Sequence, residues 1–140
     1  VGPEAPLEAG VSDLLIANRV PVVGPTQALA QIESSKAFAL KVLKKHGMQG
    51  LPAFKEFMSL AGAREFLEEL GEGNYVIKAD GLCGGKGVKV AGAHLASFDE
   101  AIEYCRECLP HFVICEKLEG QEFSVLSFCD GDTLAHMPPV

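Results

Sequence analysis

The spacing of apolar residues divides the chain into short helices and strands punctuated by glycine and proline. The pattern predicts a helix over residues 8–18 and a short buried strand over residues 20–24, ended by Gly24-Pro25. Val1-Gly2 is predicted to end an earlier parallel strand, as in a doubly wound α/β domain. Residues 1–25 are therefore interpreted as the end of a first, Rossmann-like domain.

A long helix is predicted next, from Thr26 as N-cap to His46, with Gly47 as its left-handed terminator. Lys36 falls inside the apolar stripe of this helix, so its ammonium either extends to an edge or meets an anion. The predicted stripe consists of Leu29, Ile32, Ala39, Leu40 and Leu43.

The pattern after Gly50 mixes strands and helices without regular βα alternation. Strands are predicted at 53–57, 75–79, 88–91 and 112–115, helices at 61–70 and 97–109, and a hairpin of 122–129 and 132–136 around Asp130-Gly131. This order is typical of an α+β fold, and residues 26–140 are assigned to one such domain.

Composition narrows the classes of function. The net charge of −7 and the pI near 5.0 argue against nucleic-acid or membrane-surface partners, which both need basic patches. The sequence has no apolar run long enough for a membrane span and no signal-peptide pattern, so a cytoplasmic location is expected. Five cysteines, including Cys105-x-x-Cys108, are expected to be reduced and to pack on helix faces, with zinc or redox chemistry as the alternative. The chain begins at Val1 and ends in PPV, and a piece of a longer polypeptide is expected.

Two lysines in VIKADGLCGGKGVKVA (76–91) are candidates for anion binding. Glycines surround Lys86 between two strands, so backbone amides can approach an anion closely, and a phosphate chain fits. A P-loop is excluded, because Asp80 replaces its first glycine, Gly87 replaces its Ser/Thr and a strand follows. Lys78 lies in mid-strand and needs either an exposed face or a compensating anion. The alternative for the loop is a flexible turn with a solvated lysine.

A second segment, FVICEKLEGQEFSV (112–125), suggests a nucleotide base and ribose. Its strand runs into Glu116-Lys117-Leu118, which offers a backbone edge to a flat base, and Glu122 offers a carboxylate to ribose hydroxyls. Taken alone this signal is weak, since acidic loop residues are far more often solvated.

Together these motifs resemble the ATP-grasp superfamily and, within it, the phosphoribosylamine–glycine ligase (glycinamide ribonucleotide synthetase) family. The resemblance covers nearly the whole chain and rests on VGPEAPL (1–7), VGPT (23–26), QIESSKAF (31–38), residues 76–91 and EKLEGQEFS (116–124). It implies most of the N-terminal part of an ATP-grasp domain over residues 26–140.

The resemblance implies an activity, its substrates and site residues. ATP would activate glycine for ligation to 5-phosphoribosylamine, giving glycinamide ribonucleotide, ADP and phosphate in purine synthesis. Mg²⁺ is expected, with ligands outside this chain. Lys78 and Lys86 are the expected catalytic lysines, and the expected ATP-binding residues are Lys36, Lys78, Gly84, Gly85, Lys86, Gly87, Glu116, Lys117, Leu118 and Glu122.

The sequence also departs from the family pattern. Cys115 replaces the first of two glutamates, and the loop that usually precedes residue 112 is missing. Two alternatives therefore stay open: another ATP-grasp carboxylate–amine ligase, or a degenerate nucleotide-binding or interaction segment. The 140 residues alone are expected to be inactive, and the resemblance is compatible with fusion to other purine-synthesis domains.

Overall fold

The computed structural model describes residues 3–140, so the strand end predicted at Val1-Gly2 lies outside the described residues. The chain starts with two short helices, α1 (Glu4–Glu8) and α2 (Val11–Ala17). Gly10 separates them with a φ of 84°, a left-handed conformation that glycine adopts without strain. The helix predicted at 8–18 therefore begins earlier and is interrupted.

The strand predicted at residues 20–24 is wrong for the described part of the chain, where this segment is irregular. Its apolar run indicated burial under neighbouring layers, but Val20 and Val23 are 45% and 85% exposed. Apolar character alone did not distinguish a buried strand from an exposed connection.

The long helix predicted from Thr26 is two helices, α3 (Gln27–Ser34) and α4 (Lys36–Lys45). The Thr26 hydroxyl accepts from the amide of Leu29, which confirms the predicted N-cap. Ser35 breaks the helix with extended dihedral angles and caps α4, its hydroxyl accepting from the amide of Phe38 at 3.1 Å. Lys36 consequently occupies the first position of a helix instead of the middle of one.

The break also changes which residues are buried. Leu29 and Ile32 from the predicted stripe are 64% and 55% exposed, whereas the small residues Ala30, Ser34 and Ala37 are buried. Helix α3 packs against α1, and α4 packs against the sheet, so one continuous stripe cannot serve both contacts.

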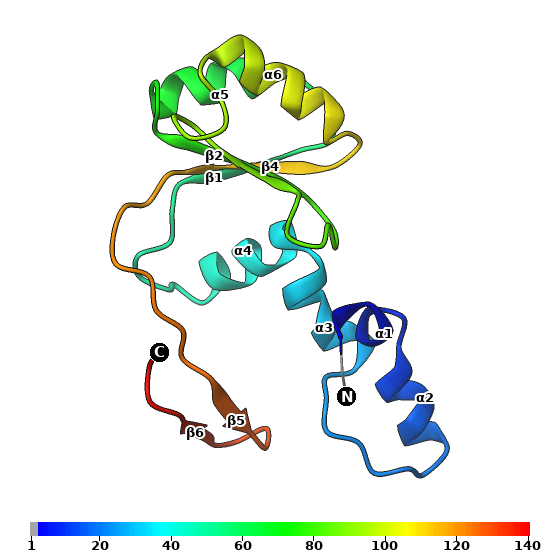
Figure 1. The fold of residues 1–140 in the computed structure, drawn as a ribbon. Coiled ribbons are helices and arrows are strands. Elements are labelled where there is room, and N and C mark those ends of the chain that lie inside the picture. Colours follow the sequence, from blue (N-terminus) through cyan, green and yellow to red (C-terminus); the bar gives the residue numbers. More distant parts are fainter. Residues whose placement is uncertain (1–2) are drawn as a thin grey trace.

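Four antiparallel strands form the main sheet in the order β1 (Phe54–Phe57), β4 (Phe112–Glu116), β2 (Tyr75–Ala79) and β3 (Val88–Val90). All four agree with the predicted strands. Helices α5 (Ala63–Leu70) and α6 (Phe98–Glu107) cover one face, and α4 lies on the opposite side (Figure 1). The Ser97 hydroxyl accepts from the amide of Glu100 and begins α6 as predicted.

Strand β4 lies inside this sheet and is buried on both faces. Phe112 and Ile114 belong to the core under α5 and α6, while Val113 and Cys115 pack with Ala37 of α4. Alternate residues of a strand point to opposite faces, so β4 joins the two cores.

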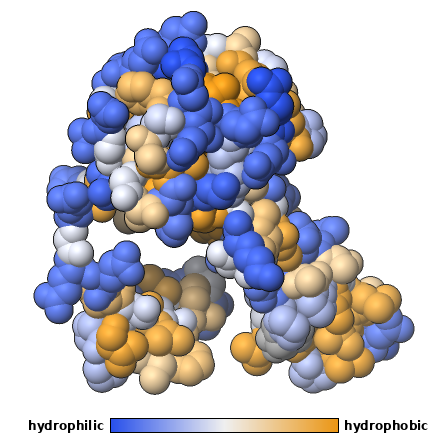
Figure 2. Space-filling view, turned by 45° about the horizontal axis from the view of Figure 1, so that its top comes forward, coloured by the Kyte–Doolittle hydropathy of each residue, from blue (hydrophilic) through white to orange (hydrophobic). Residues whose placement is uncertain are grey.

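The predicted hairpin is present as β5 (Ser127–Cys129) and β6 (Leu134–His136), and both strands are shorter than predicted. Asp130 accepts from the amides of Asp132 and Thr133 and fixes the turn. The hairpin lies away from the main sheet (Figure 1), and Figure 2 shows apolar surface on the lower lobes of the molecule. The exposed apolar residues of this region include Phe123, Val125, Leu126, Phe128, Leu134 and Met137.

None of the five cysteines, all within residues 3–140, forms a disulfide. Cys105 and Cys108 lie in the core under α5 and α6, where burial raises the pKa of both thiols. The C-x-x-C pair is thus packed as helix-face thiols, in agreement with the prediction.

Replacement of Phe112 by alanine tests how much the core under α5 and α6 contributes to the free energy of unfolding. Phe112 is fully buried and stacks on Phe57 with ring centroids 5.3 Å apart. We expect Phe112→Ala to lower the free energy of unfolding by about 3–5 kcal/mol, measured by urea denaturation. Met58→Ala, at a side chain that is 65% exposed, should change it by less than about 1 kcal/mol. Equal losses would contradict this assignment of the core.

Candidate functional site

The connection between β2 and β3 is a tight glycine loop, residues 80–87. The amide of Lys86 donates to the carbonyl of Cys83 at 3.1 Å, and the amide of Ala79 donates to the carbonyl of Gly87 at 2.8 Å. Gly84 and Gly85 have φ values of 56° and 77°, which favour glycine. The loop is therefore held by its own backbone.

Gly87 is required for a different reason, a close approach. A Cβ atom at this position would lie 2.6 Å from both Cβ and Sγ of Cys83. The side chain of Cys83 thus occupies the space that any larger residue at position 87 would need.

Part of the predicted site comes together beside this loop. Lys36 lines a pocket of about 290 Å³ together with Gly84, Gly85 and Gly87. Its ammonium donates to the carbonyl of Gly81 at 2.5 Å, so α4 is tied to the first residues of the loop. The other lining residues are Glu4, Ile32, Glu33, Ala39, Leu82, Cys83 and Val88.

Lys78 lies on β2, opposite Val88 on one side and Val113 on the other. Its alternation with Ile77 places it on the face of the sheet that α4 packs against, and it is half-buried. Lys86 is exposed in the loop. Neither ammonium has a hydrogen bond or ion pair with residues 3–140, so both cations are available to an anion.

The residues predicted to contact the base and ribose lie elsewhere. The carboxylate of Glu116 accepts from the amide of Ala53 at 3.0 Å, and the Lys117 ammonium lies 3.4 Å from Glu119. Leu118 is exposed, and Glu122 borders a separate hollow with Gln121, Phe123, Ser124 and Val140. The structure does not bring these residues into the pocket of Lys36.

Cys115, which departs from the family pattern, is buried between β4 and α4. Burial raises the pKa of its thiol, and the nearby charge of Lys78 partly opposes that shift. A thiol is small and weakly polar, so it suits this apolar position better than a carboxylate would.

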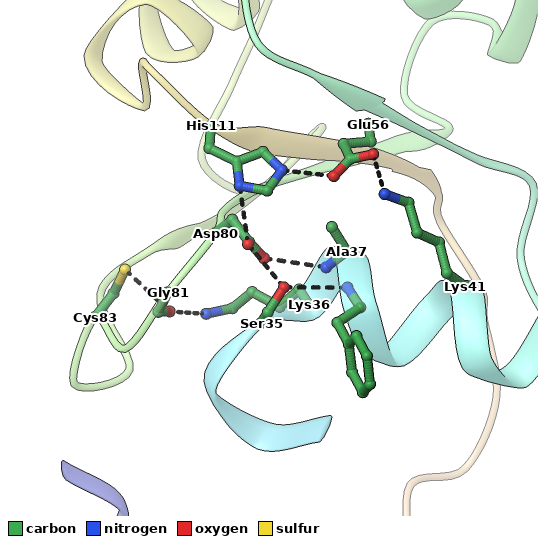
Figure 3. A network of polar contacts seen from close by, with 10 residues as sticks. Ser35, Lys36, Ala37, Lys41, Glu56, Asp80, Gly81, Cys83 and His111 are labelled. Carbon is green, nitrogen blue, oxygen red and sulfur yellow. Dashed lines mark hydrogen bonds and ion pairs between the residues drawn. The ribbon is translucent and has the colours of Figure 1, made fainter. Parts of the chain in front are cut away.

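A polar network beside Lys36 was missed by the sequence analysis (Figure 3). The carboxylate of Asp80 accepts from the Ser35 hydroxyl at 2.8 Å and from the amide of Ala37 at 3.0 Å. The His111 ring bridges Asp80, at 3.0 Å from Nδ1, and Glu56, at 2.8 Å from Nε2. The register of the two strands could have indicated this network. Ala79 pairs with Phe112 in an antiparallel arrangement, so the next residues outward, Asp80 and His111, are neighbours.

The far end of the network returns to α4 through an ion pair between Glu56 and Lys41. The Lys41 ammonium is the main cause of a lowered pKa for Glu56; burial opposes it, and the His111 ring contributes in the same direction as Lys41. Glu56 is therefore stabilised in its charged form.

Two further observations concern residues 3–140 as a whole. No group of three or more His, Cys, Asp or Glu side chains there is arranged to hold a metal ion. None of the helices in this range has the length and apolar character needed to cross a membrane.

Comparison with solved structures identifies the fold. The chain superimposes on D-alanyl-alanine synthetase A from Vibrio cholerae with a TM-score of 0.73 at 13% identity, covering 94% of this chain and 40% of that one. It superimposes on phosphoribosylamine–glycine ligase from Thermotoga maritima with a TM-score of 0.74 at 30% identity, covering 91% and 34%. The sheet with its glycine loop is that of an ATP-grasp protein.

Comparison with protein families and curated proteins is more specific. Residues 34–140 match the phosphoribosylglycinamide synthetase, ATP-grasp (A) domain family, and the chain belongs to this family. It is 46% identical to phosphoribosylamine–glycine ligase from Methanosarcina acetivorans and 42% identical to that from Methanocella arvoryzae, over its full length. In each case it spans 32% of the relative's length, about a third.

The lowered pKa of Glu56 predicts a pH-dependent contribution to stability. A carboxyl whose pKa is depressed by folding stabilises the protein above its unfolded pKa, near 4.5, and loses that effect as the pH falls. We expect Glu56→Gln to lower the free energy of unfolding by about 1 kcal/mol at neutral pH. This difference from wild type should shrink as the pH falls below 4.5, as measured by urea denaturation.

Glu69→Gln is the matched control, because Glu69 is exposed on α5 and has no ion pair with residues 3–140. Glu69→Gln should leave the free energy of unfolding nearly unchanged, both at neutral pH and below pH 4.5. A Glu56→Gln effect that is the same at neutral and acid pH would contradict the electrostatic origin.

Proposed function

We propose that the protein ligates glycine to 5-phosphoribosylamine at the expense of ATP, giving glycinamide ribonucleotide, ADP and phosphate. The observation that carries this proposal is the pocket shared by Lys36 and the glycine loop, in a chain whose residues 34–140 match the phosphoribosylglycinamide synthetase, ATP-grasp (A) domain family. This chain would supply part of the ATP site. A cytoplasmic location and fusion to other purine-synthesis domains stay predictions.

The lysines are assigned to the phosphate chain of ATP. Lys36 lies beside the loop, and Lys78 and Lys86 carry charges that residues 3–140 do not neutralise. Cations held in place offset the negative charge of the triphosphate, and they stabilise the transferring phosphoryl group without reorganisation. Gly84, Gly85 and Gly87 allow the backbone to approach the phosphates closely.

The adenine base is assigned to the backbone after β4. The amide of Lys117 is already bonded to the carbonyl of Asn74 at 2.9 Å. The carbonyl of Lys117 and the amide of Leu118 have no partner within residues 3–140, and they supply the acceptor and donor that an adenine edge needs. Glu122 is assigned to the ribose hydroxyls, and Glu116 supports the same segment through Ala53.

Mg²⁺ supplies charge neutralisation in phosphoryl transfer. Its ligands stay predicted to lie outside this chain, and no role in holding the ion is assigned to residues 3–140. Their proposed work is to bind and orient the nucleotide.

The experiment that tests the function is a coupled assay of the full-length protein. ADP and phosphate should form only when ATP, glycine and 5-phosphoribosylamine are all present. Turnover with a different carboxylate in place of glycine would favour another carboxylate–amine ligase, and absence of nucleotide binding would favour a degenerate segment. Residues 1–140 expressed alone should show no glycine-dependent ATP hydrolysis, and such hydrolysis would contradict their proposed role as a partial site.

Replacement of Lys78 tests the assignment of the phosphate site. We expect Lys78→Ala to weaken ATP binding at least tenfold, or about 1.4 kcal/mol, by removing a cation that faces the phosphates. Lys89→Ala is the control, because its ammonium lies over the Tyr104 ring at 4.1 Å and 3.9 Å from Glu107. Calorimetric titration with ATP should show less than about a twofold change for the control. Equal losses of ATP affinity in Lys78→Ala and Lys89→Ala would contradict the assignment of Lys78 to the phosphate site.

A further inference from the structure

The carboxylate of Asp80 binds the start of α4 at the two residues that flank Lys36, namely Ser35 and Ala37. Its side chain is only 7% exposed, and its carboxylate accepts from the Ser35 hydroxyl and the Ala37 amide. A carboxylate at a helix N-terminus is favoured by the unpaired amides and by the helix dipole. The backbone that carries Lys36 is thus fixed by a residue that directly precedes the glycine loop.

His111 links this carboxylate to a second one. Its Nδ1 faces Asp80 and its Nε2 faces Glu56, and both distances are in hydrogen-bonding range. A neutral imidazole carries one N–H and can donate to only one of them, leaving a lone pair against the other carboxylate. The arrangement is fully satisfied only when the ring carries both protons and a positive charge.

The contacts close into a ring that begins and ends on α4. From Asp80 the path runs through His111 and Glu56 to Lys41, five residues beyond Lys36 in the same helix. Glu56 belongs to β1, and His111 directly precedes β4, so the sheet holds the helix at two points (Figure 3). The charged groups around His111 are therefore Asp80, Glu56 and, through Glu56, Lys41, while Lys36 faces the Gly81 carbonyl.

We propose that Asp80 and His111 are positioning residues, and that His111, between two carboxylates, holds Lys36 and the glycine loop in the arrangement that accepts the triphosphate of ATP. This inference rests on the proposed function. Without the His111 ring, the link between the two carboxylates is lost, and the ring of contacts that fixes α4 opens. ATP affinity therefore falls when this side chain is replaced. AMP, which lacks the β- and γ-phosphates, is insensitive to the change.

The test compares His111→Gln with wild type in the full-length protein, by calorimetric titration with ATP and with AMP at neutral pH. The quantity compared is the ratio of variant to wild-type affinity for each nucleotide. We expect His111→Gln to weaken ATP binding about tenfold. AMP affinity should be unchanged.

Two further variants complete the test. His46→Gln is the control, because His46 is exposed at the other end of α4, and its ATP ratio should stay at one. Asp80→Asn keeps an oxygen for the Ala37 amide but removes the negative charge facing His111. It should reproduce the ATP-specific loss, and it carries the comparison if His111→Gln does not fold.

The outcomes separate this inference from the proposed function. If wild type binds ATP and His111→Gln binds it equally well, or loses ATP and AMP affinity alike, the positioning role is overturned while the ATP site stands. If wild type does not bind ATP, the proposed function fails and the inference falls with it. If neither His111→Gln nor Asp80→Asn folds, the ring of contacts around His111 serves folding alone and the proposal is overturned.

Discussion

The arrangement of the candidate site depends on one buried carboxylate, that of Asp80, at the start of α4. It joins the end of a central strand to the backbone on either side of Lys36. Without a side-chain oxygen at that point, the amide of Ala37 in the first turn of α4 would lack a partner in a half-buried environment. The helix, the glycine loop and the sheet are therefore held in register by a single side chain with three neighbours.

The main sheet gives Asp80 and α4 a fixed base, because its inner strand β4 is covered on both faces. Helices α5 and α6 bury Phe112 and Ile114, and α4 buries Val113 and Cys115. A helix that packs on an apolar strand can slide or rotate, since apolar contacts have little directionality. The hydrogen bonds of Asp80 and the ion pair of Lys41 supply the direction that packing lacks.

Local chemistry made much of this fold predictable. The caps at Thr26 and Ser97, the Asp130-Gly131 turn and the alternation of β2 and β4 are determined by residues close in sequence. The break at Ser35 was missed because the apolar spacing continues across it, and its other partner, Asp80, is 45 residues away. Burial of residues 20–24 was overestimated for the related reason that it depends on what covers the segment.

The candidate site likewise contains residues that the sequence revealed and residues that it did not. Lys36 and the loop glycines were found from composition and spacing together with a family resemblance, and the structure places them in one pocket. Asp80, Glu56 and His111 were not found, because each is an ordinary polar residue whose meaning comes from strand register. Glu122 was found from a weak local signal strengthened by the family resemblance, and no local pattern indicated that it would line a hollow separate from the pocket of Lys36.

The bond between Lys36 and the Gly81 carbonyl has one more consequence. An ammonium group carries three hydrogens, and this contact uses one of them. Lys36 can therefore keep its hydrogen bond to the loop while its two remaining N–H groups stay available to an anion. In the proposed ATP site, an anion would add partners to this ammonium without displacing the Gly81 carbonyl, and Lys36 would connect the loop backbone to the bound phosphate.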